Sequence, residues 1–403
     1  MNMLSALIVG ANADSIHAIN SAKKLGLTVA AIDGDSESEG FIYACENYTV
    51  DISNKELVLD ISNKIQPKLV IPTPIGRFLT SVGAINDQHK LNGISEKSAI
   101  LCTDKHVFHK VLSAQNNRNA KHILVNAGIG NFNDINANLT YPAIIKPRYG
   151  SGSRDVFTVF NSDQMKLCFA EKFPCDEDYI IESCKEGDEY GVDGAVINGV
   201  FQLISLRKKM LTPFPFRQCV GYFSTPECEE NFTLFMLTRA CINKVCNILN
   251  INNSLLHADV IYDGGPDIFV IEISARPAGH FLYDVFVPLS TGIDMVSEFI
   301  KFSLPELNQS YTFDPSHKKS KCMLIKFFDF SKGRITVVPD ENYLYNHYPV
   351  KKYVCSLKPG MTMDKITDGK SIIGRGYYII EADNNNELLG ISKEIEGHFI
   401  LED

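Results

Sequence analysis

The 403-residue sequence has no sustained run of lysine or arginine, no cysteine pair in CxxC spacing and no internal repeat. Its formal net charge is −9, so it does not supply the basic surface that a nucleic-acid backbone requires. The eleven cysteines stand singly between Cys45 and Cys355, which argues against structural zinc and against disulfides. Nucleic acid is therefore not an expected partner.

Targeting and membrane signals are also lacking. No apolar run approaches membrane-spanning length, and the apolar residues 4–9 have neither a basic flank nor a small-residue cleavage site. We therefore expect a cytoplasmic protein with no membrane partner. With 45% hydrophobic and 22% charged residues, the chain can bury ample apolar surface, and its length favours two or three domains.

The N-terminal region alternates between strand and helix patterns. An apolar run at residues 4–9, a helical pattern at 14–25 and an apolar run at 27–32 predict a βαβ unit. A helical pattern at 55–65 and an apolar run at 69–71 repeat the alternation. The pattern predicts a small parallel sheet with helices on its faces.

The remaining sequence favours a different class of structure. Longer hairpins mixed with helices predict an α+β region with antiparallel sheets, and short strands with turns predict a β-rich C-terminal part. The predicted domains are residues 1–100, 101–310 and 311–403, with a lid subdomain at about 115–185. The predicted fold class is therefore α/β followed by α+β.

Two carboxylates are predicted to face each other in a hairpin. Alternating apolar runs flank a turn at residues 263–267, which sets Asp259 opposite Glu272 and His257 opposite Ser274. Opposed side chains lie roughly 5 Å apart at Cβ, and two like charges at that distance repel by about 3 kcal/mol at an effective dielectric near 20. A divalent cation with oxygen ligands, such as Mg²⁺, would relieve that repulsion.

Strand alternation places Glu272, Ser274 and Arg276 on one face of this hairpin. The opposite face is predicted to carry the apolar residues Phe269, Ile271, Ile273 and Ala275. Arg276 would add a fixed positive charge suited to a transferring phosphoryl group or a tetrahedral intermediate. The alternative is a solvated polar face on an ordinary hairpin.

A glycine-rich loop follows the buried strand at residues 141–146, which ends at Lys146. Gly150, Ser151 and Gly152 would let backbone amides close over phosphate oxygens, and Lys146 would supply a mobile positive charge. A simple turn between strands is the alternative interpretation.

Two further segments carry polar candidates. Lys105 lies in the first turn of a helix that Thr103 or Asp104 caps, where a bound phosphate would offset its unfavourable position or where it is simply solvated. After a strand at residues 179–182, an acidic corner ends at Glu189, whose carboxylate could accept hydrogen bonds from ribose hydroxyls.

Taken together and in this order, these stretches resemble the ATP-grasp superfamily over nearly the whole chain. The resemblance rests on the helix start at Lys105, the Ile-Ile-Lys-Pro strand at residues 144–147, the corner at 182–189 and the segment 270–277. It implies an ATP-grasp fold with a Rossmann-like N-terminal domain, a central domain of two α+β subdomains and a C-terminal β-rich lobe.

The resemblance also implies roles for particular residues. It assigns the phosphates of ATP to Lys105, Lys146 and the Gly150–Gly152 loop, and catalysis to Arg276. It assigns adenine to Glu182, Ser183 and Cys184, ribose to Glu189, and Mg²⁺, or Mn²⁺ in its place, to Asp259, Glu272 and Ser274. The sequence departs from the usual pattern at two positions. The position of Asp259 more commonly holds glutamate, and the position of Ser274 usually holds asparagine, a better metal ligand.

Within the superfamily the chain looks most similar to bacterial L-amino-acid ligases. That similarity implies ATP-dependent amide-bond formation through an acyl-phosphate, with a small carboxylate and an amine as substrates. Substrate contacts are expected at Arg207, Lys208, Arg217, Gly279 and His280, although each charge is equally well explained as a surface group. Homodimers are common among similar enzymes, but no stretch of this chain specifies one.

Three other functions stay open. A carboxylase or purine-pathway ligase would use the same nucleotide site with bicarbonate or formate. A nicotinamide-dependent oxidoreductase is suggested by residues 9–14 and Asp33, but Ala13 and Ser15 stand near the positions where the fingerprint needs glycine. A non-catalytic nucleotide-binding protein is disfavoured because it has no need to keep opposed charges.

Overall fold

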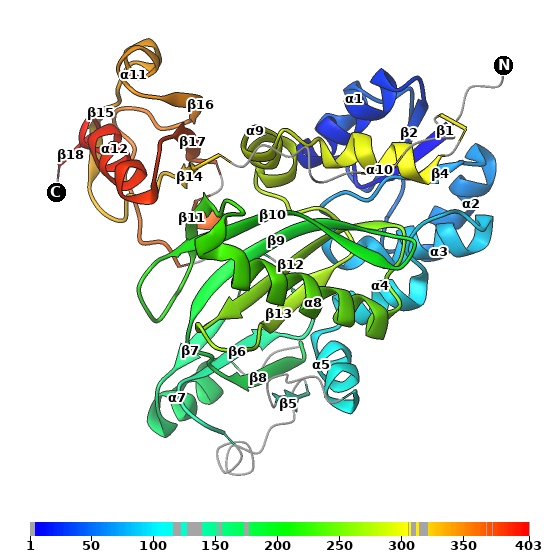
Figure 1. The fold of residues 1–403 in the computed structure, drawn as a ribbon, viewed down its shortest axis with the longest axis horizontal. Helices are drawn as coiled ribbons and strands as arrows, with labels where there is room; N and C mark the ends of the chain where they lie inside the picture. The colour runs from blue at the N-terminus through cyan, green and yellow to red at the C-terminus, as the bar shows by residue number, and fades with distance from the viewer. Residues whose placement is uncertain are drawn as a thin grey trace. The chain divides into compact units, whose positions relative to one another are not determined.

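A computed structural model describes the protein at residues 5–115, 122–126, 139–150, 152, 155–172, 177–304, 306–307, 312–313, 321–367, 369–372 and 374–402. The chain forms two compact units (Figure 1). The first comprises Met1–Asn119, Gly191–Leu206 and Glu229–Lys319, and the second comprises Ala120–Tyr190, Arg207–Cys228 and Ser320–Asp403. Each unit is therefore assembled from three separate segments of the sequence.

The first unit begins with a four-stranded sheet in the order β3-β2-β1-β4, in which all pairs are parallel. Its strands are β1 (Ser5–Val9), β2 (Thr28–Asp33), β3 (Glu46–Thr49) and β4 (Leu69–Val70). Because α1 (Ile16–Lys24) connects the parallel strands β1 and β2, the predicted βαβ start is confirmed.

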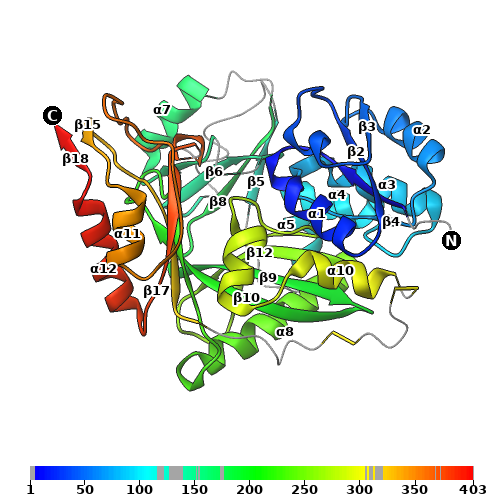
Figure 2. The ribbon, with the colours of Figure 1, turned by 90° about the horizontal axis from the view of Figure 1, so that it is seen from above.

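Several helices of this unit begin at a side chain that caps the helix. Asn54 accepts from the Leu57 amide at the start of α2 (Lys55–Ile65), and Ser95 accepts from the Ser98 amide at the start of α4 (Glu96–Thr103). The other helices here are α3 (Leu79–His89), α5 (Lys105–Ala114), α9 (Val287–Thr291) and α10 (Met295–Ser303). Figure 2 shows α1 and α10 side by side.

An antiparallel sheet completes the first unit, with neighbours in the order β13-β12-β9-β10. Its strands are β9 (Asp188–Ile197), β10 (Val200–Leu211), β12 (Ser254–Tyr262) and β13 (Phe269–Ser274). Residues of both sheets and of α1 and α10, among them Ile8, Ala195, Leu255 and Phe299, bury one shared hydrophobic core. This core fixes the loops that follow β1, β4 and β13 relative to one another.

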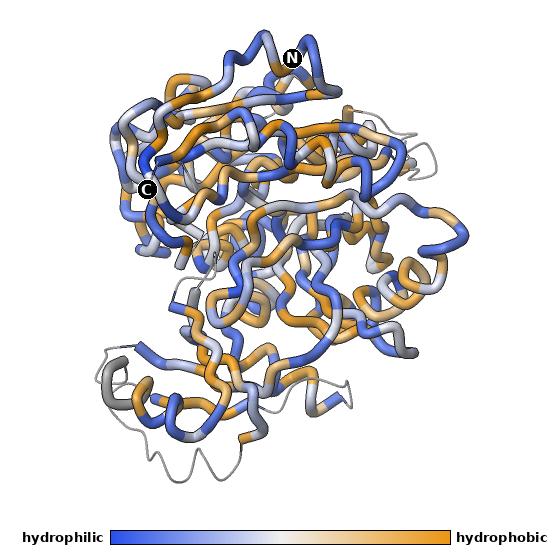
Figure 3. The backbone as a smooth tube through the Cα atoms, turned by 90° about the vertical axis from the view of Figure 1, so that its left-hand side faces the viewer, coloured by the Kyte–Doolittle hydropathy of each residue, from blue (hydrophilic) through white to orange (hydrophobic). Residues whose placement is uncertain are grey.

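The helix α8 (Phe232–Leu249) is the longest helix among the described residues. By length and composition, Glu229–Leu249 is the one helical segment of the described residues that could cross a membrane. Its buried residues recur at helical spacing: Leu234, Phe235, Thr238, Ile242, Val245, Cys246 and Leu249. Arg239 and Lys244 interrupt the run, and this spacing is typical of a helix that packs one face against its own unit. Apolar and polar stretches are interspersed along the described part of the chain (Figure 3).

The second unit contains two antiparallel sheets. One has the order β5-β8-β6-β7, with β5 (His122–Val125), β6 (Ala143–Pro147), β7 (Phe157–Val159) and β8 (Tyr179–Ser183). The other continues from β10 in the order β11-β14-β17-β16, with β11 (Cys219–Ser224), β14 (Met323–Phe327), β16 (Val350–Cys355) and β17 (Gly376–Glu381). A further pair joins β15 (Arg334–Val337) to β18 (Ile400–Glu402), and the helices are α7 (Ser162–Lys172), α11 (Glu341–His347) and α12 (Asn385–Gly397).

Candidate nucleotide and metal site

The hairpin of β12 and β13 pairs the residues that the sequence selected. Asp259 lies opposite Glu272, and His257 lies opposite Ser274, so the predicted register is confirmed at these two positions. All four residues are partly buried, whereas Ala258 and Ile273 between them are fully buried. The two carboxylates therefore share the less buried face of one hairpin.

A β-bulge changes the hairpin toward its turn. The pairing shifts between Asp259 and Val260, so that Val260 faces Val270 and Ile271 is the extra residue. As a result Val270 is buried at 2% exposure while Phe269 and Ile271 are only partly buried. The alternation predicted for Phe269, Ile271 and Ile273 is therefore interrupted at the bulge, because strict alternation assumes a strand without an extra residue.

His257 lies between two acidic side chains on neighbouring strands. Its Nδ1 is 3.4 Å from Asp193 Oδ1 on β9, and its Nε2 is 3.6 Å from Asp259 Oδ1. Asp193 is fully buried, and sequence reasoning missed it. The available signal was an aspartate inside an otherwise apolar strand, where a buried charge needs a partner.

Arg276 follows β13 and interacts with the carboxylates around it. Burial lowers the pKa of its guanidinium, while the charges of Glu272, Asp14 and Asp259 act in the opposite direction. Its Nη1 donates to the Pro277 carbonyl oxygen at 2.8 Å, and its buried Nε makes no hydrogen bond to any described residue. Arg276 thus places a positive charge beside both carboxylates of the hairpin.

Asp14 joins this cluster from the loop after β1, and sequence reasoning also missed it. Burial raises the pKa of its carboxyl, against the charges of His280 and Arg276. A Cβ added at Gly279 would lie 3.4 Å from Asp14 Oδ2 and 3.4 Å from Pro74 Cβ. The loops after β1, β4 and β13 therefore meet where the predicted substrate residues Gly279 and His280 lie.

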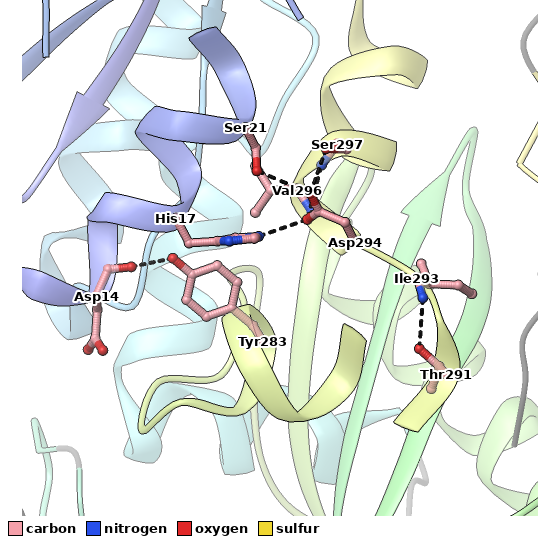
Figure 4. A network of polar contacts seen from close by, with 9 residues as sticks. All are labelled: Asp14, His17, Ser21, Tyr283, Thr291, Ile293, Asp294, Val296 and Ser297. Carbon is pink, nitrogen blue, oxygen red and sulfur yellow. Dashed lines mark hydrogen bonds and ion pairs between the residues drawn. The ribbon is translucent and has the colours of Figure 1, made fainter. Parts of the chain in front are cut away.

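A polar network holds the backbone of Asp14 in place (Figure 4). The Tyr283 hydroxyl donates to the Asp14 carbonyl oxygen, and Tyr283 also packs edge-on against His17 of α1. His17 Nε2 is 2.9 Å from Asp294 Oδ1, at the N-cap of α10. The position of Asp14 therefore depends on contacts between α1 and residues 283–294.

Lys105 is the first residue of α5, as the sequence predicted. Asp104 is the N-cap, since its side chain accepts from the amides of His106 and Val107. Lys105 is partly buried in the first unit.

In the second unit, Lys146 and Glu182 contact each other directly. Lys146 Nζ lies 2.6 Å from Glu182 Oε1, and the residues are 5% and 4% exposed. They meet because β6 and β8 are neighbours in the sheet. Sequence reasoning assigned these residues to different parts of ATP and did not foresee the pair.

Glu189 and Cys184, two other candidates of the second unit, both have hydrogen-bond partners within the protein. Glu189 accepts from Arg217 Nη2 at 2.6 Å, and Lys209 Nζ is 3.7 Å away. The Cys184 amide donates to the Pro142 carbonyl oxygen, and burial raises the pKa of the Cys184 thiol. The amide of Cys184 is therefore already engaged within the protein.

The remaining predicted residues are placed as follows. Ser183 ends β8 and is partly buried, Gly150 and Gly152 are exposed, and Ser151 lies outside the described residues. Arg207 is fully buried, with its Cζ 4.9 Å from the centroid of the Tyr222 ring. The interpretation of Arg207 as a surface charge was therefore wrong.

The hairpin offers oxygen atoms that could bind a metal ion. Among the described residues, no group of three or more histidine, cysteine, aspartate or glutamate side chains is arranged to bind a metal alone. Asp259 and Glu272 nonetheless offer opposed carboxylate oxygens, the donor type that hard divalent cations prefer. The residues thus fit an ion that takes its other ligands from water or a bound substrate.

Part of the chain is similar to a known family of domains. A profile described as "ATP-grasp domain" matches residues 139–284. The D-alanine–D-alanine ligase of Clostridium beijerinckii is 35% identical over 99 residues, which cover 24% of this chain and 33% of that protein. The D-alanine–D-alanine ligase B of Clostridium perfringens is 32% identical over 119 residues, which cover 29% of this chain and 39% of that protein. The matches thus span little more than a third of these relatives.

Matches that cover more of the chain have lower sequence identity, and the solved structures among them have a similar fold. The formate-dependent phosphoribosylglycinamide formyltransferase of Prochlorococcus marinus is 18% identical over 284 residues, covering 67% of this chain and 69% of that protein. The solved L-amino acid ligase of Bacillus licheniformis superposes with a TM-score of 0.78 at 14% identity, covering 100% of both chains. Phosphoribosylglycinamide synthetase of Anaerococcus prevotii gives 0.70 at 18% identity over 100% of both. The parallel and antiparallel sheets therefore form an ATP-grasp fold, as predicted.

Proposed function

We propose that this chain, which has an ATP-grasp fold and matches the ATP-grasp domain at residues 139–284, is an ATP-dependent carboxylate–amine ligase. The observation that carries the proposal is the opposed pair Asp259 and Glu272 with the Arg276 guanidinium beside it. A scaffold protein or an oxidoreductase does not need this arrangement. The negative charges of the two carboxylates repel each other until a cation is bound.

The first unit would hold the metal ion and the reacting phosphate. Asp259 and Glu272, with Ser274 as a weaker ligand, would bind Mg²⁺ or Mn²⁺, which when bound neutralises phosphate charge. Arg276 would stabilise charge on the transferring phosphoryl group. Lys105, in the first turn of α5, would contact a phosphate.

Residues of the second unit are also proposed to bind ATP. Lys146 gives one of its three N–H groups to Glu182 and keeps the others for phosphate oxygens, together with the Gly150–Gly152 loop. Glu182, Ser183 and Cys184 would bind adenine, the last through its carbonyl oxygen. Glu189, fixed by Arg217, would accept from the ribose hydroxyls.

The proposed reaction has two steps. A substrate carboxylate attacks the γ-phosphorus of ATP, which breaks the bond to the β-phosphate oxygen and gives an acyl-phosphate and ADP. The substrate amine then attacks the acyl carbon, phosphate leaves with the electron pair, and the amine loses a proton. We propose amino acids as both substrates, since the similar ligases join two alanines or L-amino acids.

Other features of the enzyme are part of the same proposal. We propose that Arg207, Arg217, Gly279 and His280 contact the substrates. We also propose three domains, at residues 1–100, 101–310 and 311–403. We further propose a cytoplasmic location and a homodimer, without nucleic acid or membrane as partner.

The decisive experiment is a pairwise amino-acid screen for phosphate release from Mg-ATP, with the products identified by mass. The proposal expects release that depends on both amino acids and a product whose mass equals their sum minus water. Glu272→Ala should abolish turnover with little loss of fold, because it removes half of the proposed metal site. Turnover unchanged in Glu272→Ala would contradict the metal assignment.

The same screen tests a ligase or carboxylase that uses bicarbonate or formate. The similarity to a formate-dependent formyltransferase over two thirds of the chain favours this second candidate. Phosphate release driven by bicarbonate or formate alone would replace the amino-acid proposal.

A further inference from the structure

Three polar side chains form a row across β9 and β12 of the first unit. Asp193 on β9 faces His257 on β12, and His257 in turn faces Asp259 two residues along the same strand. The contacts of 3.4 and 3.6 Å involve both ring nitrogens of His257. The imidazole therefore bridges two carboxylates, one of which is proposed to bind the metal.

Burial differs sharply along this row. The side chain of Asp193 is 0% exposed, whereas those of His257 and Asp259 are 14% and 15% exposed. A carboxylate withdrawn from water is costly unless it is paired. Asp193 thus lies at the buried end of the row, His257 lies in the middle, and Asp259 lies at the partly exposed end.

Side chains alternate along a strand, so residues 257 and 259 project to the same face of β12. The two ring nitrogens lie 3.4 Å from Asp193 and 3.6 Å from Asp259, so the ring is held between the two carboxylates. Asp193 thus restricts the orientation of the ring, and the ring restricts the orientation of the Asp259 side chain.

We propose that Asp193 and His257 are positioning residues that hold the Asp259 carboxylate in the orientation required for metal binding. This inference rests on the proposed function, because it assigns the metal to Asp259 and Glu272. Groups that orient a metal-binding side chain typically contribute about 10- to 100-fold to metal affinity. Neither residue was selected as a site residue from the sequence.

The test measures Mn²⁺ affinity by electron paramagnetic resonance in the presence of a non-hydrolysable ATP analogue. His257→Leu keeps a similar volume and removes both ring nitrogens, and it should weaken Mn²⁺ binding about 10- to 100-fold. His257→Gln, which can direct an amide N–H toward Asp259, should recover part of the affinity. Circular dichroism and thermal midpoints establish that each variant is folded at the temperature of the measurement.

A double-variant cycle shows whether Asp193 acts on Mn²⁺ affinity through His257 or independently of it. Asp193→Asn preserves shape and should weaken binding less than His257→Leu, and the double variant should be no weaker than His257→Leu alone. His89→Gln is the matched control, because His89 Nε2 contacts Ser62 Oγ at 3.0 Å in the same unit and belongs to no part of the proposed site. Its Mn²⁺ affinity should equal that of the wild type.

Several outcomes would overturn the inference. Mn²⁺ affinity of His257→Leu within twofold of wild type would remove His257 from the positioning role, and losses that multiply in the double variant would remove Asp193. If His257→Leu does not fold, the same cycle is built on His257→Gln. Failure of the wild type to bind Mn²⁺ with the nucleotide would refute the proposed function as well, so the two failures are distinguishable.

Discussion

Replacing Lys146 by methionine should destabilise the second unit far more than replacing a comparable surface lysine. In the structure, Lys146 Nζ lies 2.6 Å from Glu182 Oε1, and both side chains are almost fully buried. Methionine keeps the length of the aliphatic stem and removes the charge. The substitution leaves the carboxylate of Glu182 buried without the ammonium that now compensates it.

The magnitude follows from the distance and the burial. At 2.6 Å two unit charges attract by about 6 kcal/mol at an effective dielectric near 20. Withdrawing both groups from water offsets much of this attraction, and breaking such a pair by removing one partner costs about 3–5 kcal/mol. A double variant, Lys146→Met with Glu182→Leu, should recover part of this loss because no uncompensated charge remains.

Lys208→Met provides a matched control in the same unit. Lys208 Nζ lies 2.7 Å from Asp188 Oδ2, but these side chains are 41% and 53% exposed. An exposed pair contributes about 0–1 kcal/mol because water screens the charges. The assay is urea unfolding of the wild type and the three variants, followed by circular dichroism. Similar losses in Lys146→Met and Lys208→Met would refute the argument that burial sets the strength of the pair.

Two further predictions concern the first unit. Arg276→Ala should lower the maximal rate of phosphate release more than nucleotide affinity, and the opposite pattern in steady-state kinetics and calorimetry would remove Arg276 from catalysis. Asp284→Asn should stabilise the protein at neutral pH, because burial raises the pKa of this carboxyl to about 6. Between pH 4 and 6 the folded state binds more protons than the unfolded state, so wild-type stability falls as pH rises, by no more than about 3 kcal/mol. Thermal midpoints of both proteins should converge toward pH 4, and a constant difference across pH would contradict this sign.

Local patterns predicted those parts of the structure whose partners are close in sequence. A short turn fixes the register of a hairpin, so the pairing of Asp259 with Glu272 followed from the turn and the alternation. The strand–helix–strand start followed from apolar spacing in the same way. Strict alternation from Phe269 to Ile273 was not observed, because a single extra residue in β13 changes which side chains face the core.

Contacts across strands that are distant in the sequence required the tertiary structure. Lys146 meets Glu182 only because β6 and β8 are neighbours, and Asp193 meets His257 only because β9 lies beside β12. Asp14 reaches the site through the meeting of loops after β1, β4 and β13. The sequence by itself determined which residue types bear the chemistry and how the local hairpin pairs them. Only the three-dimensional arrangement decided which charges are buried and paired, because burial depends on packing between segments far apart along the chain.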